Sequence, residues 1–363
     1  MERYLILKDG TVYTGEAIGA SGDAIGEAVF TTAMCGYMQT LTDPSYYGQI
    51  VAQTFPLIGN YGAIEDDAES AKPYLAGYIV RELCECGSNF RKDGELDDYL
   101  KRNGIVGIAG IDVRALTRKL RSSGVMGAML TDSLKDMPRK LAEIKKFRVR
   151  NAVENTTCGG VTEVNPVDAE HPLKVVLYDF GAKYNIERML ISHGCSVTRV
   201  PASTTAEDAL ALRPDGIMLS NGGGDPADNT SVIAELKKLC ECKLPIFGIC
   251  LGHQLLALAN GFQTVKLKYG HRGANQPVTD VVGGRTYITS QNHGYAVRAS
   301  SVDESVATLL FTNANDKTVE GLEYKNAPMF SVQFHPEACG GPKDTGYLFD
   351  RFVESMRAAK GGN

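Results

Sequence analysis

The stretch PIFGICLGHQLLALANG, residues 245–261, places a cysteine between a short apolar run and a helical pattern. PIFGI has the composition of a buried strand, and the residues from 251 to the glycine at 261 are typical of a helix. Cys250 therefore stands at a bend between strand and helix, with Gly248 and Gly252 on either side. This G-x-C-x-G pattern has the form of a nucleophile elbow in which sulfur replaces the hydroxyl oxygen.

An elbow of this kind makes a thiol reactive. The glycines allow a sharp turn, which is expected to lift the Cys250 side chain out of the packed sheet. The N-terminus of the following helix stabilises negative charge and favours the thiolate. The backbone N–H of Leu251 is then placed to stabilise an oxyanion. The alternative is a buried structural cysteine, because cysteine is usually a small core hydrophobe.

A second motif supplies the partners that a nucleophile needs. The stretch MFSVQFHPEACGG, residues 329–341, ends a strand pattern with His335 and Glu337, two positions apart. In an extended chain both side chains point to one side. Glu337 can then orient the imidazole while its other nitrogen faces the sulfur. A lone His-Pro-Glu is commonly a polar turn, but with the elbow it predicts a Cys-His-Glu triad.

The residues around the elbow predict an α/β fold. KVVLYD, CSVTRVP, DGIMLS and LPIFGI are apolar runs separated by helical patterns. Such runs predict a parallel sheet covered on both faces. The later strand-rich residues extend it into a mixed, mostly parallel sheet flanked by helices. Ligands in such folds bind beyond the carboxyl ends of strands, which points to the turns after Ser220, Ile249 and Phe334.

The first 150 residues follow a different pattern. YLILKDGTVYTGEAIG predicts a hairpin that turns at Asp9-Gly10, and DVRALTRKLRSSG predicts a helix closed by Gly124. Strands and helices do not alternate regularly, so residues 1–150 are expected to form an α+β domain with its own core. Residues 151–172 are polar and broken by glycine and proline, which predicts a linker. Residues 173–363 are then the second domain.

Composition limits the classes of function. The 363 residues include 43% hydrophobic and 22% charged residues, with a net charge of −5. These values are typical of a globular protein of about two domains. The chain has no dense basic patch of the kind that would indicate nucleic-acid binding. No apolar run reaches the length of a membrane span. Without a secretory signal, a cytoplasmic protein is expected.

The nine cysteines do not predict a metal site. Cys84 and Cys86, and likewise Cys240 and Cys242, are separated by a single residue, which is a poor spacing for zinc. The odd number of cysteines indicates reduced thiols in a chain of this size. No metal is therefore expected, and because the sequence has no ATP-grasp motif, no cofactor is expected in this chain either.

GICLGHQ, residues 248–254, together with the His335-Pro336-Glu337 motif, resembles the class I glutamine amidotransferases. The resemblance implies catalytic roles for Cys250, His335 and Glu337. It also implies glutamine contacts at Ser45, Gly222, Gly224, Leu251, Gln254, Asn292, Gly294 and Tyr295. His253 and His293 have no carboxylate placed to orient them, and they are interpreted as shaping the site. In the turn at 219–228, Gly223 replaces the proline that is usual in the family, which implies a less rigid oxyanion loop.

The first half resembles the N-terminal domain of the small subunits of carbamoyl-phosphate synthases. The resemblance is carried by EAVFTTAMCGYMQTLTDPSYYGQIVAQTFPLIGNYG, residues 27–62, and extends over nearly the whole chain. It departs locally, at Met38-Gln39 and at the ACGGP that follows Glu337. It implies that residues 1–150 dock a large synthetase subunit, which uses bicarbonate, ATP and magnesium and receives ammonia released from L-glutamine.

Other functions stay open on sequence grounds. A free-standing γ-glutamyl hydrolase or cysteine peptidase could use the same elbow, and it would work without a partner. A docking subunit could keep the fold without catalysis, and another amidotransferase branch could share the triad. The sequence also leaves open whether the product serves arginine synthesis, pyrimidine synthesis or both.

Overall fold

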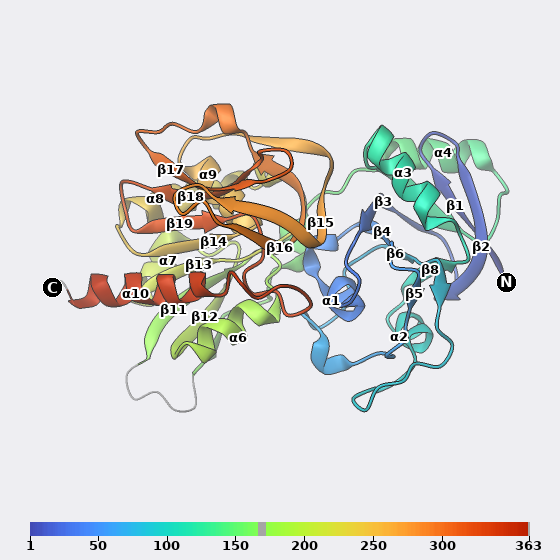
Figure 1. Ribbon diagram of the computed structural model, residues 1–363, viewed down its shortest axis with the longest axis horizontal. Coiled ribbons are helices and arrows are strands. Elements are labelled where there is room, and N and C mark those ends of the chain that lie inside the picture. Colours follow the sequence, from blue (N-terminus) through green and yellow to red (C-terminus); the bar gives the residue numbers. More distant parts are fainter. Residues whose placement is uncertain (166–171, 362–363) are drawn as a thin grey trace. The chain divides into compact units, whose positions relative to one another are not determined.

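The computed structural model describes residues 1–165 and 172–361. The chain divides into two compact units, Met1–Arg150 and Asn151–Asn363. Figure 1 shows the strands and helices of each unit.

The first unit contains a closed barrel of seven strands in the order β1-β2-β8-β6-β4-β3-β9. The predicted hairpin is confirmed, since β1 pairs antiparallel with β2. Val29, Val51 and Tyr78 belong to the core of this unit. The barrel strands are β1 (Glu2–Leu7), β2 (Val12–Gly19), β3 (Ala24–Thr31), β4 (Gln49–Gln53), β6 (Gly77–Ile79), β8 (Val106–Ala109) and β9 (Met126–Thr131).

Short helices and two short strands complete the first unit. They are α1 (Tyr37–Thr42), α2 (Leu96–Arg102), α3 (Val113–Ser123), α4 (Met137–Lys146), β5 (Leu57–Ile58) and β7 (Glu82–Leu83). The predicted helix α3 is confirmed, and its limits have local causes. The Asp112 carboxylate accepts from the Ala115 N–H at 2.9 Å, and Gly124 closes the helix with a φ of 88°.

The second unit is built on a ten-stranded sheet in the order β10-β12-β11-β13-β14-β19-β18-β17-β15-β16. The four pairings from β12 to β19 are parallel, and the other five are antiparallel. Its strands are β10 (Thr162–Val164), β11 (Leu173–Asp179), β12 (Cys195–Pro201), β13 (Gly216–Leu219), β14 (Ile246–Ile249), β15 (Thr264–Asp280), β16 (Thr286–Val297), β17 (Ala307–Asn313), β18 (Val319–Tyr324) and β19 (Met329–Val332). The mixed α/β class is confirmed. The expectation of a mostly parallel sheet is corrected, because strands β15 to β18 and the edge strand β10 pair antiparallel with their neighbours.

Helices cover both faces of this sheet (Figure 1). They are α6 (Tyr184–Ser192), α7 (Ala206–Ala211), α8 (Thr230–Glu241), α9 (Leu251–Ala259) and α10 (Tyr347–Gly361). Val176 and Tyr178 of β11 pack in one core cluster with α7, α8 and α9. Val175 and Leu177 pack in the other cluster with α6 and α10. This alternation is the two-residue period of a strand that is buried on both faces.

The span 151–172 holds regular structure where a linker is expected. It contains helix α5 (Ala152–Thr156) and strand β10. Val164 of β10 lies opposite Val197 of β12, so this stretch forms an antiparallel edge of the second sheet. Residues 166–171, which belong to the same expected linker, lie outside the described residues. A three-residue edge strand has too little apolar periodicity to be predicted from its own sequence.

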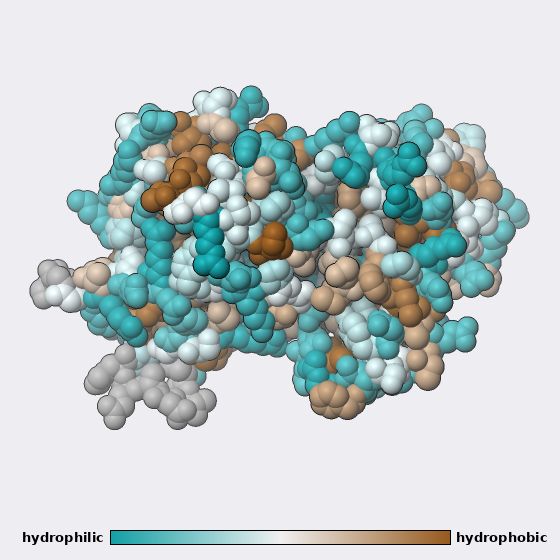
Figure 2. Space-filling view, viewed as in Figure 1, coloured by the Kyte–Doolittle hydropathy of each residue, from teal (hydrophilic) through white to brown (hydrophobic). Residues whose placement is uncertain are grey.

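Some large hydrophobic side chains are exposed on the surface. Figure 2 shows hydrophobic residues scattered among hydrophilic ones over the visible face. Met34, Phe90 and Val282 are among the exposed large hydrophobic side chains. In the described ranges, no helix combines the length and the apolar character that crossing a membrane requires.

Candidate active site

The elbow at Cys250 has an unusual backbone conformation. Cys250 directly follows β14 and is the N-cap of α9, with φ 53° and ψ −102°. Non-glycine residues rarely adopt a positive φ, and such strain collects at functional sites. The Cys250 N–H donates to the Val332 carbonyl at 2.8 Å. The strained residue is therefore tied to the neighbouring strand β19.

The flanking glycines act through close packing. Neither Gly248 nor Gly252 has a positive φ, so the sharp turn that was expected of them lies at Cys250 itself. A Cβ at Gly248 would come within 2.9 Å of the Gly252 backbone, and one at Gly252 within 2.4 Å of the Leu219 carbonyl oxygen. The missing side chains let helix α9 begin directly against β13 and β14.

The Cys250 thiol is buried, which corrects the expectation that the elbow lifts it clear of the sheet. Its residue is 2% exposed. The thiol donates to the carbonyl oxygen of Asn292, with 3.6 Å between Sγ and oxygen. The segment around Asn292 in β16 lies against the sulfur and contributes to its burial.

The predicted His335–Glu337 pair is present. His335 Nδ1 lies 2.7 Å from Glu337 Oε1, and both residues are almost fully buried. The pair lies in a turn where an extended chain was expected, because the Ala338 N–H donates to the His335 carbonyl at 3.2 Å. Strands β14 and β19 are parallel neighbours, with Ile249 opposite Val332. The elbow and the histidine thus follow adjacent strands, at the edge that the sequence predicts.

Two residues of the α6 region contact Glu337, and sequence reasoning missed both. Lys183 Nζ lies 2.8 Å from Glu337 Oε1, and this lysine is 8% exposed. The Asn185 side-chain amide donates to the Glu337 backbone carbonyl. Both lie in the stretch YDFGAKYN, which carries no local pattern that links it to a carboxylate about 150 residues away. Their only signal was the wider family resemblance of that stretch.

The charges of the pair follow from these contacts. Burial works to raise the pKa of Glu337, but Lys183 and His335 outweigh it and hold that pKa at about 2. Burial and Lys183 work to lower the pKa of His335, while Glu337 and Cys250 raise it to about 9. At neutral pH the carboxylate is therefore ionised and the imidazole is protonated. A protonated ring beside a nucleophile can donate a proton to a leaving group.

The other two histidines near the elbow have no carboxylate at hydrogen-bond distance. His253 Nδ1 lies 2.8 Å from the Ser331 hydroxyl oxygen, and burial lowers the pKa of His253 to about 3. His293 Nδ1 lies 2.7 Å from the Tyr295 carbonyl oxygen, and burial holds its pKa well below the ordinary value. Both rings are neutral at pH 7, and neither contact involves Cys250.

Several of the expected glutamine contacts lie together around the elbow. A Cβ at Gly222 would come within 2.7 Å of Leu251 Cδ2 and 2.3 Å of the Phe180 carbonyl oxygen, so only glycine fits there. Gln254 Nε2 donates to the Tyr295 carbonyl at 2.7 Å. These contacts bring the 222 turn, the start of α9 and strand β16 to one region.

Three further expected contacts have different surroundings. Gly224 has a φ of 88°, and a Cβ there would lie 2.9 Å from the Ala152 Cβ. A Cβ at Gly294 would lie 3.2 Å from the Arg272 guanidinium. Ser45 belongs to the first unit, where it lies in a buried 3-10 turn and its N–H donates to Asp43 Oδ1 at 2.9 Å.

Two models of known protein families match this chain. Residues 176–355 match the family model described as glutamine amidotransferase class-I. Residues 5–130 match the model described as the CPSase domain of the carbamoyl-phosphate synthase small chain. The second unit is thus defined by fold and site as a class I glutamine amidotransferase domain.

Full-length relatives narrow this class to one family. A carbamoyl phosphate synthase small chain of Syntrophotalea carbinolica is 50% identical over 374 residues and is aligned over 98% of each chain. One of Fusobacterium nucleatum is 50% identical over 355 residues, again over 98% of each chain. One of Listeria monocytogenes is 46% identical, over 99% of this chain and 98% of the relative. The chain belongs to the family of carbamoyl phosphate synthase small chains.

Proposed function

We propose that the chain hydrolyses the side-chain amide of L-glutamine with Cys250, His335 and Glu337, and passes the ammonia to a large synthetase subunit. The observation that carries the proposal is the 2.7 Å His335–Glu337 contact in the turn after β19, the strand that pairs with β14 before the Cys250 elbow. A nucleophile, a base and a group that orients the base are the minimum for acyl transfer.

In the first step Cys250 attacks the amide carbon of glutamine as a thiolate, its proton having passed to His335. A bond forms between sulfur and carbon, and the amide oxygen becomes an oxyanion. The Leu251 N–H is suited to stabilise it, because it lies in the first turn of α9 and lacks an intrahelical acceptor. The C–N bond then breaks, and protonated His335 gives its proton to the departing nitrogen, which leaves as ammonia.

In the second step water hydrolyses the glutamyl thioester. Neutral His335 takes a proton from the attacking water, the C–S bond breaks, and glutamate is released. Glu337 keeps the ring aligned and stabilises its charged form, and Lys183 holds Glu337 in place at 2.8 Å. These steps use side chains, the Leu251 N–H and water, so they need no cofactor.

Glutamine binding involves the groups around the elbow and is expected to disturb the Asn292 contact. Because Cys250 is 2% exposed, the substrate must displace the Asn292 carbonyl from the sulfur. Gly222, Gly224, Leu251, Gln254, Asn292, Gly294 and Tyr295 supply backbone and amide groups for the zwitterion. A buried zwitterion needs such hydrogen bonds because it loses water.

The relatives' name supports a large-subunit partner. In this proposal residues 1–150 dock that subunit, which makes carbamoyl phosphate from bicarbonate and ATP with magnesium. A protected path for ammonia is needed because free ammonia is protonated in water and lost as a nucleophile. The complex works in the cytoplasm and supplies arginine synthesis, pyrimidine synthesis or both.

The test compares wild type with Cys250→Ser, each in complex with the large subunit. We expect Cys250→Ser to lose glutamine hydrolysis by about 10³-fold or more. Synthesis from added ammonium salt serves as the control and should be unchanged, because it bypasses the thiol. Equal glutamine hydrolysis by both proteins would overturn the mechanism.

Two other results would favour the rival functions. Full-rate cleavage of γ-glutamyl peptides without the large subunit indicates a free-standing hydrolase. A stable wild-type complex with no glutamine hydrolysis indicates a docking subunit.

A further inference from the structure

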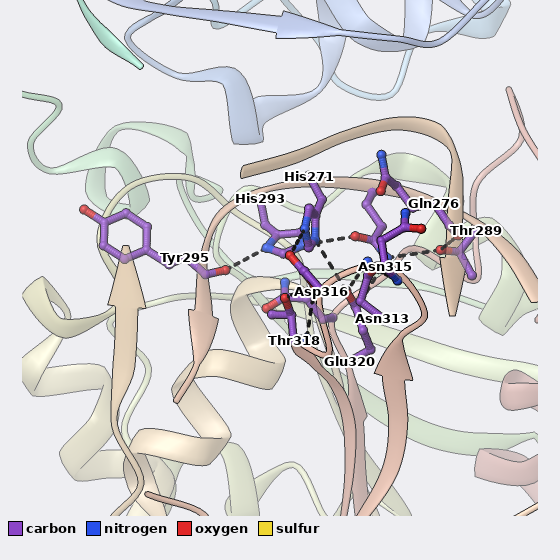
Figure 3. Close-up of polar contacts among 12 residues, drawn as sticks. His271, Gln276, Thr289, His293, Tyr295, Asn313, Asn315, Asp316, Thr318 and Glu320 are labelled. Atoms are coloured by element: carbon purple, nitrogen blue, oxygen red, sulfur yellow. Dashed lines mark hydrogen bonds and ion pairs between the residues drawn. The ribbon is translucent and has the colours of Figure 1, made fainter. Parts of the chain in front are cut away.

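A buried polar cluster lies beside the candidate active site. His271 of β15 and His293 of β16 stand opposite each other on paired strands, and Glu320 comes from β18. Figure 3 shows the two rings and the carboxylate converging. One ligand atom from each residue lies within 4.8 Å of the other two. Three residues that commonly bind metals are thus gathered from three strands.

Each imidazole of the cluster has one ring nitrogen bound to an acceptor. His271 Nε2 lies 2.9 Å from Asp316 Oδ2. His293 Nδ1 lies 2.7 Å from the Tyr295 carbonyl oxygen. Since a carboxylate and a carbonyl only accept, each of these nitrogens carries the proton. This is the outer hydrogen bond that orients histidine ligands in metal sites, and it leaves the opposite nitrogen to bind an ion.

The second ring nitrogen of each imidazole has no hydrogen-bond donor beside it. His271 Nδ1 is buried without a hydrogen-bond partner and lies 3.5 Å from Glu320 Oε1. His293 Nε2 lies 3.0 Å from Gln291 Oε1, although an amide oxygen is also an acceptor. The Gln291 amide nitrogen donates to Glu320 Oε2 at 3.0 Å, which fixes this orientation of the amide. Several lone pairs therefore point toward one another, an arrangement that a cation stabilises.

We propose that His271 Nδ1, His293 Nε2 and a Glu320 oxygen bind one zinc ion. Two imidazoles and one carboxylate form a ligand set that zinc uses, whereas magnesium and calcium prefer oxygen ligands alone. Ligand atoms of a tetrahedral zinc site are about 3.3 Å apart, as follows from bond lengths near 2 Å. The 3.5 Å separation of His271 and Glu320 is already close to this value. The Gln291 amide oxygen or a water would complete the coordination.

Such an ion would stiffen the strand that lies against the nucleophile. His293 directly follows Asn292, whose carbonyl accepts from the Cys250 thiol. The zinc would act as a positioning element for this segment and take no part in bond breaking. The inference rests on the cluster alone and does not depend on the proposed glutamine hydrolysis. It departs from the sequence-based expectation of no metal, because these ligands lie far apart along the chain.

The competitor for the His271 lone pair is a proton. Burial opposes a charged ring, but Asp316 and Glu320 together raise the pKa of His271 to about 9. In that case the cluster is an ion-paired network of one imidazolium and two carboxylates. The experiment must therefore measure metal binding directly.

The test titrates the metal-free full chain with Zn²⁺ and with Co²⁺, followed by calorimetry and visible absorption. We expect one equivalent to bind and the cobalt form to show tetrahedral d–d bands without a sulfur-to-cobalt charge-transfer band. The absence of the sulfur-to-cobalt band matters because all nine cysteines are free and could bind metal themselves. Glu320→Gln should abolish binding, and Asp316→Asn should weaken it about 10- to 100-fold. His193→Asn, which alters a histidine outside the cluster, is the matched control and should bind as wild type does.

Folding is checked separately. Zn²⁺ should raise the melting temperature of wild type and leave that of Glu320→Gln unchanged. If Glu320→Gln does not fold, the zinc affinity of Asp316→Asn tests the proposal instead. This variant is expected to fold because the Asp316 side chain is half-exposed. The proposal is overturned if no stoichiometric binding occurs, if folded Asp316→Asn binds as tightly as wild type, or if the cobalt spectrum shows thiolate ligands.

Discussion

The turn after β19 and the first turn of helix α9 both bury a histidine, yet at pH 7 one ring is protonated and the other is neutral. His253 is 0% and His335 2% exposed. Burial lowers the pKa of His253 to about 3, whereas the pKa of His335 is raised to about 9. The difference comes from the partner, because His253 contacts a hydroxyl and His335 contacts a carboxylate. Burial makes an imidazole neutral, and only a paired carboxylate keeps it available as a proton donor.

Replacing each histidine in turn is the most direct test of the contrast between His335 and His253. His335→Asn should lower kcat for glutamine hydrolysis by about 10³-fold or more, because the proton donor is lost. His253→Asn should keep activity within about tenfold and lower the free energy of unfolding by about 1–3 kcal/mol, since it loses only a buried hydrogen bond. Steady-state kinetics and denaturant unfolding measure the two effects. Equal losses of kcat in both variants would contradict the assignment.

A smaller effect is expected at Lys183. Lys183→Met removes the ammonium that lowers the pKa of His335, so that pKa should rise. Less neutral His335 is then present at pH 7, and we expect kcat to fall about tenfold, with the pH profile shifted to higher pH. Lys183→Arg restores the positive charge and is the matched control. A pH profile that is unchanged in Lys183→Met would show that the lysine does not act through the pair.

The smallest effect is a pH dependence of stability with opposite signs at the two histidines. The pKa of His335 is about 9 in the folded chain and 6.5 in the unfolded chain. Its contribution to the free energy of unfolding is therefore complete below pH 6.5 and is lost as pH rises through 9. His253 has a folded pKa of about 3, so its contribution is present above 6.5 and is lost as pH falls toward 3. The unfolding cost of His335→Asn should therefore be larger at pH 6 than at pH 10. The cost of His253→Asn should shrink between pH 7 and pH 4. Urea unfolding at these values tests both, and parallel pH curves would refute the contrast.

The sequence predicts those parts of the site whose chemistry is local. The elbow is visible because strand, cysteine and helix follow one another, and His335 and Glu337 are two residues apart. The hairpin of β1 and β2 and the caps of α3 also depend on near neighbours. A short stretch of sequence predicts each of these features because the interactions that fix the feature span only a few residues.

The rest of the fold and of the site depends on contacts between residues that are distant in sequence. The parallel β3–β4–β6–β8 pairings that close the barrel join strands separated by other elements. Lys183 reaches Glu337 only because the sheet brings the start of α6 to the edge beyond β19. The burial of Cys250 depends on β16, which follows the elbow by about 40 residues. No local pattern encodes such contacts, because they depend on strand order and register.

Direct detection of a covalent intermediate tests the triad most sharply. Wild-type chain in complex with its large subunit is mixed with isotopically labelled glutamine, quenched with acid during turnover and digested for mass spectrometry. The account predicts one glutamyl group bound as a thioester to the peptide that contains Cys250, and none in Cys250→Ser. A label on another residue, or turnover without any acylated chain, would contradict it.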